Sequence, residues 1–81
     1  MLLRAGDLLV QRVPGLRWWN LVQGSIEDIV VTEQGTVSTV LRHLAQDADG
    51  LRPDLLEVAV GGRECRIFFK PDQLEQLWEV L

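Results

Sequence analysis

Residues 55 to 69 read LLEVAVGGRECRIFF and decide the expected fold, because two apolar stretches flank a Gly-Gly pair. Two strands joined by a two-residue glycine loop are a strong signal of an antiparallel hairpin. Successive side chains of a strand point to opposite faces, so one face collects the apolar side chains and the other collects the charged ones. The expected apolar face consists of Leu56, Val58, Val60, Cys65, Ile67 and Phe69.

Upstream of this hairpin the sequence indicates three more strands. They are expected at residues 7–13, 17–23 and 26–33, where apolar and β-branched residues are frequent. Pro14-Gly15 suits a turn after the first of them. For the second and third, a helical interpretation stays open, because Gly24 followed by Ser25 can equally end one helix and cap another.

Two helices are expected in addition. Residues 36–48 carry apolar side chains at the spacing of one helix face, with Thr36 as the cap and Asp49-Gly50 as the end. Residues 71–81 repeat that spacing, and Pro71 suits a first helical turn. The two apolar stripes are Val37, Val40, Leu41, Leu44, Ala45 and Ala48, then Leu74, Leu77, Trp78 and Leu81.

The resulting order, βββαββα, predicts a small single α+β domain over residues 1–81. Its helices are expected to pack on one face of a mostly antiparallel sheet. The composition, 47% hydrophobic and 25% charged, is that of a globular protein and shows no bias toward disorder.

A cytoplasmic location is expected. The longest stretch without a charged residue, 18–26, is too short and too polar to span a bilayer. The single cysteine cannot form an intramolecular disulfide, which fits a reducing compartment.

The charge is acidic and unevenly distributed. The net charge is −4, which argues against nucleic acid as a partner, since phosphate binding depends on lysine and arginine. Residues 1–23 hold three arginines against one aspartate, whereas residues 24–60 hold seven acids against two arginines. An acidic inhibitor or regulator that imitates nucleic-acid charge and occupies a basic site of its partner is therefore an alternative function.

No residue pattern points to catalysis or to a cofactor. Cys65 and His43 are the only cysteine and histidine, so a thiol enzyme would have to use this pair. On the expected helix His43 faces solvent, whereas Cys65 shares a strand face with Ile67 and Phe69, so a buried structural thiol is expected. No metal is expected either, because one histidine, one cysteine and scattered carboxylates lack ligand spacing.

The stretch PGLRWW, residues 14–19, indicates where a partner binds. Adjacent residues of a strand point to opposite faces, so one of the two tryptophans is expected near the surface. Periodicity does not decide which one, and the alternative is that both rings pack in the core. Tryptophan beside arginine is the composition of an interface anchor. The expected partner-binding residues are Arg12, Arg17, Trp18, Trp19 and, on the terminal helix, Trp78.

The expected function is a non-enzymatic protein–protein interaction or assembly module that self-associates as a homodimer or binds another protein. A domain of this size gains stability by covering an edge strand or an exposed tryptophan, and two-fold dimers are the commonest oligomers. No membrane contact and no small-molecule substrate are expected.

Overall fold

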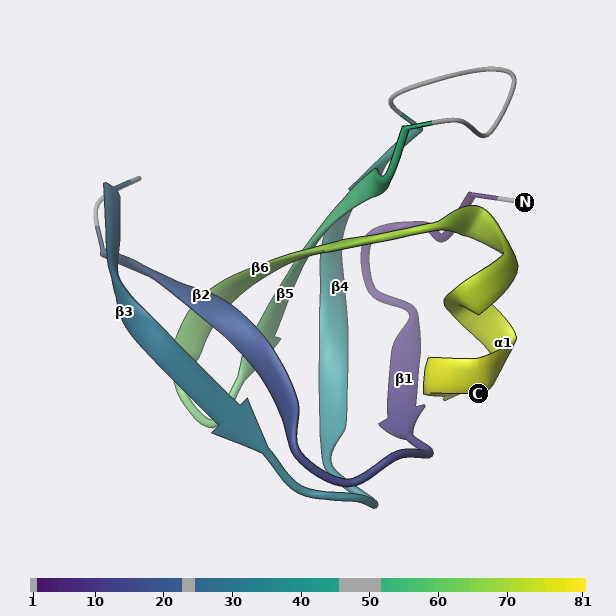
Figure 1. Cartoon of the computed structure of the whole chain (residues 1–81), viewed down its shortest axis with the longest axis horizontal. Coiled ribbons are helices and arrows are strands. Elements are labelled where there is room, and N and C mark those ends of the chain that lie inside the picture. Colours follow the sequence, from purple (N-terminus) through teal and green to yellow (C-terminus); the bar gives the residue numbers. More distant parts are fainter. Residues whose placement is uncertain (1, 23–24, 46–51) are drawn as a thin grey trace.

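The computed structural model describes residues 2–22, 25–45 and 52–81. In these stretches the chain forms seven strands and one short helical segment (Figure 1). The strands are β1 (Leu8–Gln11), β2 (Leu16–Val22), β3 (Ser25–Thr32), β4 (Val37–Leu44), β5 (Asp54–Val60), β6 (Arg63–Phe69) and β7 (Trp78–Val80). The helical segment is a 3₁₀ turn, Pro71–Gln73, followed by α1, Leu74–Leu77.

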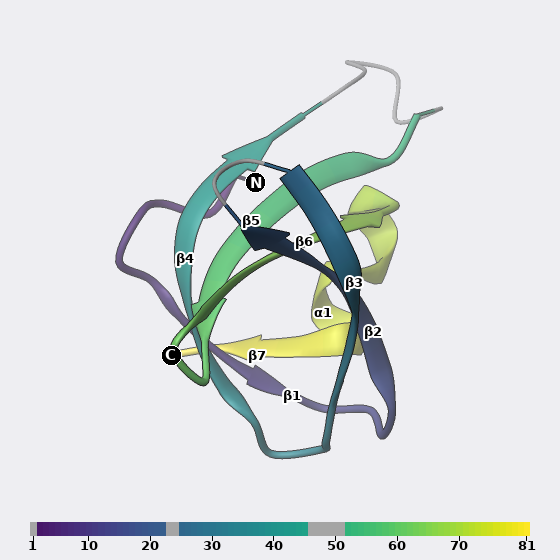
Figure 2. The ribbon, with the colours of Figure 1, turned by 90° about the vertical axis from the view of Figure 1, so that its left-hand side faces the viewer.

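All seven strands belong to one antiparallel sheet with the order β3-β2-β6-β5-β4-β1-β7. The sheet is strongly curled, and Figure 2 shows β1 and β7 crossing the open side of the curve formed by the other strands. The ring of Trp18 on β2 therefore meets the ring of Trp78 on β7, with 5.8 Å between their centroids, although four strands lie between β2 and β7 in the order. The inside of this curl is the hydrophobic core.

The core is filled from almost every element. Phe69 packs edge-on against Trp78, with ring centroids 5.2 Å apart, and such aromatic pairs stabilise beyond the area that they bury. The inward set expected for the hairpin at 55–69 is confirmed, since all six residues are buried in this cluster. The core cluster comprises Leu3, Leu9, Trp18, Val40, Leu56, Val58, Val60, Cys65, Ile67, Phe69, Leu74 and Trp78.

The hairpin itself is also confirmed. β5 and β6 pair from Asp54↔Phe69 to Val60↔Arg63, which leaves Gly61 and Gly62 as the loop. Their φ angles are 57° and 76°. Two consecutive positive φ values are what a tight two-residue turn requires, and glycine reaches them without a steric penalty.

A polar cluster closes the seam where the end of β3 comes close to β1. The Nε2 of Gln11 donates to the carbonyl of Thr32 at 2.7 Å. The Thr32 hydroxyl donates to Oε1 of Gln11 and accepts a 2.8 Å bond from Nε1 of Trp18. All three side chains are buried, so their polar groups need these partners.

The expected α+β fold with helices packed on the sheet is wrong. The three strands expected before residue 36 are present as β1, β2 and β3, which also excludes the helical interpretation of 17–33 for the described residues. However, Val37–Leu44 and Trp78–Val80, which were expected in the two helices, are strands, and the order βββαββα is replaced by seven strands with one short helical segment before the last.

The segment expected as the first helix forms strand β4 instead. Of its apolar stripe, Val40 is buried, whereas Val37, Leu41 and Leu44 are exposed. A bulge between Val40 and Arg42 places Leu41 as an extra residue in the strand. It shifts the alternation by one residue, so the inward positions are Ser38, Val40 and His43, and the helix-like apolar spacing is made largely by exposed residues. The expected helix end at Asp49-Gly50 lies outside the described residues.

The terminal helix is much shorter than expected. It ends at Leu77, and Trp78–Val80 continue as β7, which pairs with β1 from Gln11↔Trp78 to Leu9↔Val80. β1 lies between β4 and β7 in the sheet. The pairing therefore satisfies the second edge of β1, which a longer helix would have left unpaired.

Candidate functional site

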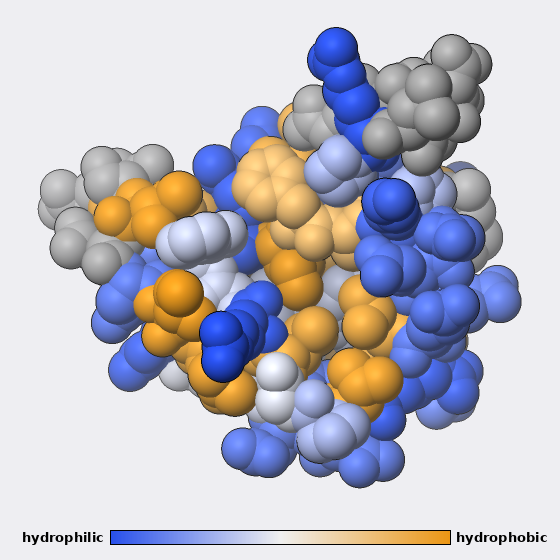
Figure 3. Space-filling view, in the orientation of Figure 1, coloured by the Kyte–Doolittle hydropathy of each residue, from blue (hydrophilic) through white to orange (hydrophobic). Residues whose placement is uncertain are grey.

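The two outermost strands at one side of the sheet, β3 and β2, carry a group of exposed apolar side chains. On their outer face Trp19 lies opposite Ile29 and Arg17 lies opposite Val31. Trp19 is 41% exposed, Ile29 is 52% exposed and Val31 is 54% exposed. Figure 3 shows hydrophobic residues gathered over this hairpin, with a strongly hydrophilic residue among them. We call Arg17, Trp19, Ile29 and Val31 the hairpin face.

The hairpin face is hollowed. A shallow pocket of about 260 Å³ is lined by Arg17, Trp18, Trp19 and Ile29. An aromatic ring, a branched aliphatic side chain and a guanidinium around one depression can receive an apolar side chain and an acceptor group of a partner. Ligand pockets enclose their ligands, whereas this site is an open surface depression, so it suits a protein surface better than a small molecule.

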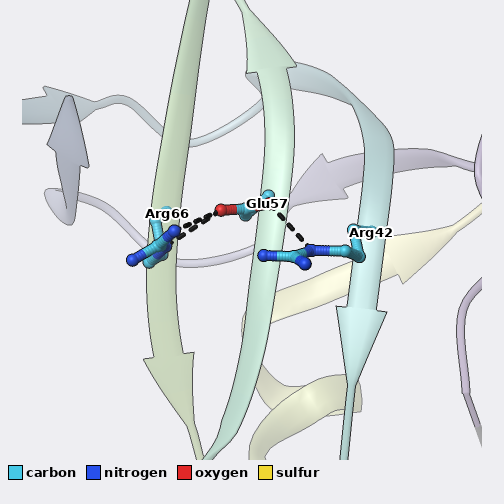
Figure 4. Close-up of polar contacts among 3 residues, drawn as sticks. All are labelled: Arg42, Glu57 and Arg66. Atoms are coloured by element: carbon cyan, nitrogen blue, oxygen red, sulfur yellow. Dashed lines mark hydrogen bonds and ion pairs between the residues drawn. The ribbon is translucent and has the colours of Figure 1, made fainter. Parts of the chain in front are cut away.

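A charged row continues from Trp19 across the neighbouring strands. Trp19 pairs with Arg66 on β6, Arg66 with Glu57 on β5, and Glu57 with Arg42 on β4. The carboxylate of Glu57 accepts bonds from both arginines: Nη2 of Arg66 lies 2.7 Å from Oε2, and Nε of Arg42 lies 2.9 Å from Oε1 (Figure 4). Two arginines on one carboxylate leave this row with a net positive charge.

The ionisation of Glu57 follows from this geometry. Burial of the carboxyl opposes ionisation, but the hydrogen bonds and charges of Arg66 and Arg42 outweigh it. The pKa of Glu57 is therefore lowered from its ordinary value of 4.5, and the side chain is an ionised carboxylate at neutral pH.

The structure brings together two of the five expected partner-binding residues on one surface. Arg17 and Trp19 are exposed on the hairpin face. Trp18 and Trp78 are buried and meet each other in the core. Arg12 is exposed just after β1, where its backbone N–H donates to the carbonyl of Leu77 at 2.8 Å.

Sequence reasoning missed Ile29 and Val31 as surface residues. Their β-branched side chains indicate a strand but do not show which face of it is exposed. The signal that identifies them is the pairing: once 17–33 is taken as a hairpin, Ile29 lies directly across from Trp19 and shares its face. The periodicity of one segment alone does not contain this information.

His43 and Cys65 do not form the pair that a thiol enzyme would need. His43, expected to face solvent, is buried. Cys65 is buried as expected, and burial raises the pKa of its thiol, with Arg63 opposing this shift and Asp28 adding to it. Cys65 lies across from Val58, whereas His43 lies across from Leu56, so different cross-strand rows hold them. A protonated, buried thiol is a poor nucleophile.

The part of the chain that the structure describes contains neither a metal-binding cluster nor a membrane-spanning helix. No group of three or more histidine, cysteine, aspartate or glutamate residues there could hold a metal ion. Among the same residues, no helix combines the length and the apolar character needed to cross a bilayer.

No protein-family model matches the chain, and neither a curated protein nor a solved structure matches it. The function must therefore be argued from the surface and its chemistry.

Proposed function

We propose that this chain is a non-enzymatic protein–protein interaction module of the cytoplasm, and that it self-associates through the hairpin face. The observation that carries the proposal is the exposure of Trp19 beside Ile29, Val31 and Arg17 on one sheet face. Tryptophan and arginine are the residue types most enriched among those that dominate binding energy. An exposed apolar group of this kind is typical of an interaction site.

Self-association is favoured by the position of β3. It is an edge strand of eight residues, SIEDIVVT, without proline, lysine or arginine; its two acids and its bulge against β2 lie in the first half, which leaves residues 29–32 as a regular apolar edge. Natural edge strands are usually shortened, charged with lysine or interrupted by proline, because their free backbone groups otherwise pair with another chain. The opposite edge, β7, has only three residues. A second copy whose hairpin face packs on this one would cover Trp19, Ile29 and Val31 of both copies and shield the neighbouring edge of β3.

The acidic-mimic alternative has weaker support. Of the acids between residues 24 and 60, Glu57 is neutralised by two arginines and Asp54 is buried against His43. Asp47 and Asp49 lie outside the described residues. Among the four acids of this segment whose side chains the structure describes, Asp28 and Glu33 are exposed, so half of these carboxylates are unavailable to imitate the charge of a nucleic acid.

The test is sedimentation equilibrium of the wild type and Trp19→Ala over a wide micromolar range. We expect a wild-type dimer and a folded monomer for Trp19→Ala, because truncating a central interface tryptophan costs about 2 kcal/mol or more of binding energy. Leu41→Ala is the matched control: Leu41 is also 41% exposed but lies on β4. It should leave the dimer intact.

Other outcomes are equally informative. A concentration-independent wild-type monomer would contradict self-association. Equal weakening by both substitutions would show that the hairpin face is not the contact. Repeating the measurement in high salt tests the nature of the contact, since a dimer held by apolar side chains persists there, whereas a dimer held by surface charges weakens.

A further inference from the structure

His43 is a buried histidine with both ring nitrogens in hydrogen bonds. Its side chain is 1% exposed. The backbone N–H of Leu3 donates to Nδ1 at 2.8 Å. On the other side of the ring, Nε2 lies 2.9 Å from Oδ2 of Asp54, which is itself buried. The ring also packs against Phe69, with centroids 5.5 Å apart.

The amide of Leu3 determines where the imidazole carries its proton. A backbone N–H can only donate, so Nδ1 must accept and cannot be protonated. In the neutral ring the single proton is then on Nε2, which donates it to the carboxylate of Asp54. The hydrogen-bond pattern therefore selects one tautomer.

A second proton can enter this ring only at Nδ1. It converts the acceptor of the Leu3 bond into a donor, so two N–H groups would point at each other over 2.8 Å. The bond to Asp54 responds in the opposite way, because it becomes a charge-assisted pair between imidazolium and carboxylate. Protonation of Nδ1 therefore strengthens the bond between the ring and Asp54 and breaks the bond between the ring and the amide of Leu3.

The Leu3 bond holds the start of the described chain against the core. Leu3 belongs to the same buried cluster as Phe69 and Trp78. The next residues have anchors of their own, since Arg4 N–H donates to Asp7 Oδ2 and Gly6 N–H donates to the carbonyl of Val40, both at 2.8 Å. Loss of the Leu3 bond would leave residues 2–3 held by the Leu3 side chain alone, while the following turn stays attached to β4.

Other charged groups on the surrounding elements point elsewhere. Arg42 on β4 and Glu57 on β5 pair with each other on the outer face of the sheet (Figure 4). On the helical segment, Asp72 and Glu75 are exposed, and so is Arg4 before β1. The carboxylate of Asp7 accepts a hydrogen bond from the backbone N–H of Arg4. The titratable side chain in contact with the ring is Asp54.

We propose that His43 is a proton-sensitive latch: its unprotonated Nδ1 holds Leu3 in the core at neutral pH, and protonation of Nδ1 releases residues 2–3 while the sheet stays folded. A two-state element of this kind gives the module a response to acidification that is independent of how the hairpin face is used.

The latch is tested by NMR on the wild type. At neutral pH the ring nitrogens of His43 should report a proton on Nε2 alone, and the Leu3 amide should be protected from exchange. On acidification, we expect the intrinsic-rate-corrected exchange of Leu3 to rise about tenfold or more as the second proton enters the ring, because the amide then loses its acceptor. The amide of Val58, in a central strand, should stay protected.

Three results would overturn the proposal: a proton on Nδ1 at neutral pH, unchanged Leu3 protection once the ring is doubly protonated, or simultaneous loss of Val58 protection, which would mean global unfolding.

Two substitutions separate the two bonds of the ring. In His43→Asn the side-chain carbonyl replaces the Nδ1 acceptor but does not titrate, so Leu3 should be protected at both pH values. In His43→Gln the amide replaces the Nε2 donor toward Asp54 and leaves no Nδ1 acceptor, so Leu3 should exchange rapidly at both. A pH response of Leu3 that persists in His43→Asn would assign the effect to a carboxylate such as Asp7 and refute the latch.

Discussion

Trp18 and Trp19 lie next to each other in the chain but have different surroundings. Strand alternation sends the ring of Trp18 into the core and leaves the ring of Trp19 41% exposed. The buried ring needs a partner for its N–H, and the hydroxyl of Thr32 supplies it at 2.8 Å. One small hydroxyl therefore supports the buried tryptophan of β2 and also bonds to Gln11 across the seam.

Removing the Thr32 hydroxyl while keeping the volume of the side chain should destabilise the protein. In Thr32→Val the Nε1 of Trp18 and the Oε1 of Gln11 both lose a partner inside the protein. We expect the free energy of unfolding in urea to fall by about 1–3 kcal/mol, the cost of leaving buried polar groups unpaired. Thr39→Val, the same change at a half-buried position of β4, is the control. Equal stability of the two variants would mean that the seam contributes little.

Strand β4 is irregular, and this irregularity makes it hard to recognise as a strand from the sequence. Its β-branched residues Val37, Thr39 and Val40 favour an extended backbone, yet the bulge at Leu41 breaks the alternation that identifies a strand. The bulge also decides that His43 faces inward, because the alternation restarts one residue later. The inward position of His43, on which the latch depends, therefore results from the same bulge that makes the strand hard to recognise in the sequence.

The strand assignment of β4 can be tested by stability. On a helix, Val40 and Leu41 would both lie on the apolar stripe, whereas on β4 only Val40 is buried. We expect Val40→Ala to lower the free energy of unfolding by about 1–3 kcal/mol and Leu41→Ala to change it by less than about 0.5 kcal/mol. Chemical denaturation measures both. A large loss for Leu41→Ala would argue against the bulged strand.

At the scale of the whole molecule, the chain has a net charge of −4 but presents a positive row across its outer face. Arg42, Glu57 and Arg66 join three neighbouring strands, β4, β5 and β6. The contribution of this row to stability depends on the charge of Glu57, because both arginines donate to its carboxylate.

The lowered pKa of Glu57 predicts a pH dependence of stability. A carboxyl whose pKa is lower in the folded state stabilises the protein above its ordinary value, here 4.5, and this contribution is lost as the pH falls through the folded-state pKa. We therefore expect the difference in unfolding free energy between wild type and Glu57→Gln to shrink as the pH is lowered below 4.5. Urea denaturation at several pH values measures it. A difference that does not vary with pH would contradict the ion-paired state of Glu57.

Local sequence was sufficient to predict part of the candidate site. Arg17 and Trp19 could be named from the stretch PGLRWW, because tryptophan beside arginine is an unusual surface composition. Which tryptophan is exposed depends on which side of β2 the rest of the sheet encloses, and the same enclosure places Trp18 against Trp78. Neither the exposure of Trp19 nor the contact between Trp18 and Trp78 can be predicted from one segment of the sequence.

The sequence by itself determined the hairpin of β5 and β6 and its inward face, because a Gly-Gly turn and strict alternation act between residues close in the chain. Only the tertiary structure decided that β4 is a strand and that the chain after Leu77 pairs with β1. Short amphipathic segments can bury their apolar residues as helix or as strand, and the choice follows from which partner has free backbone groups. Here β1, at Leu8–Gln11, accepted a strand on both of its edges.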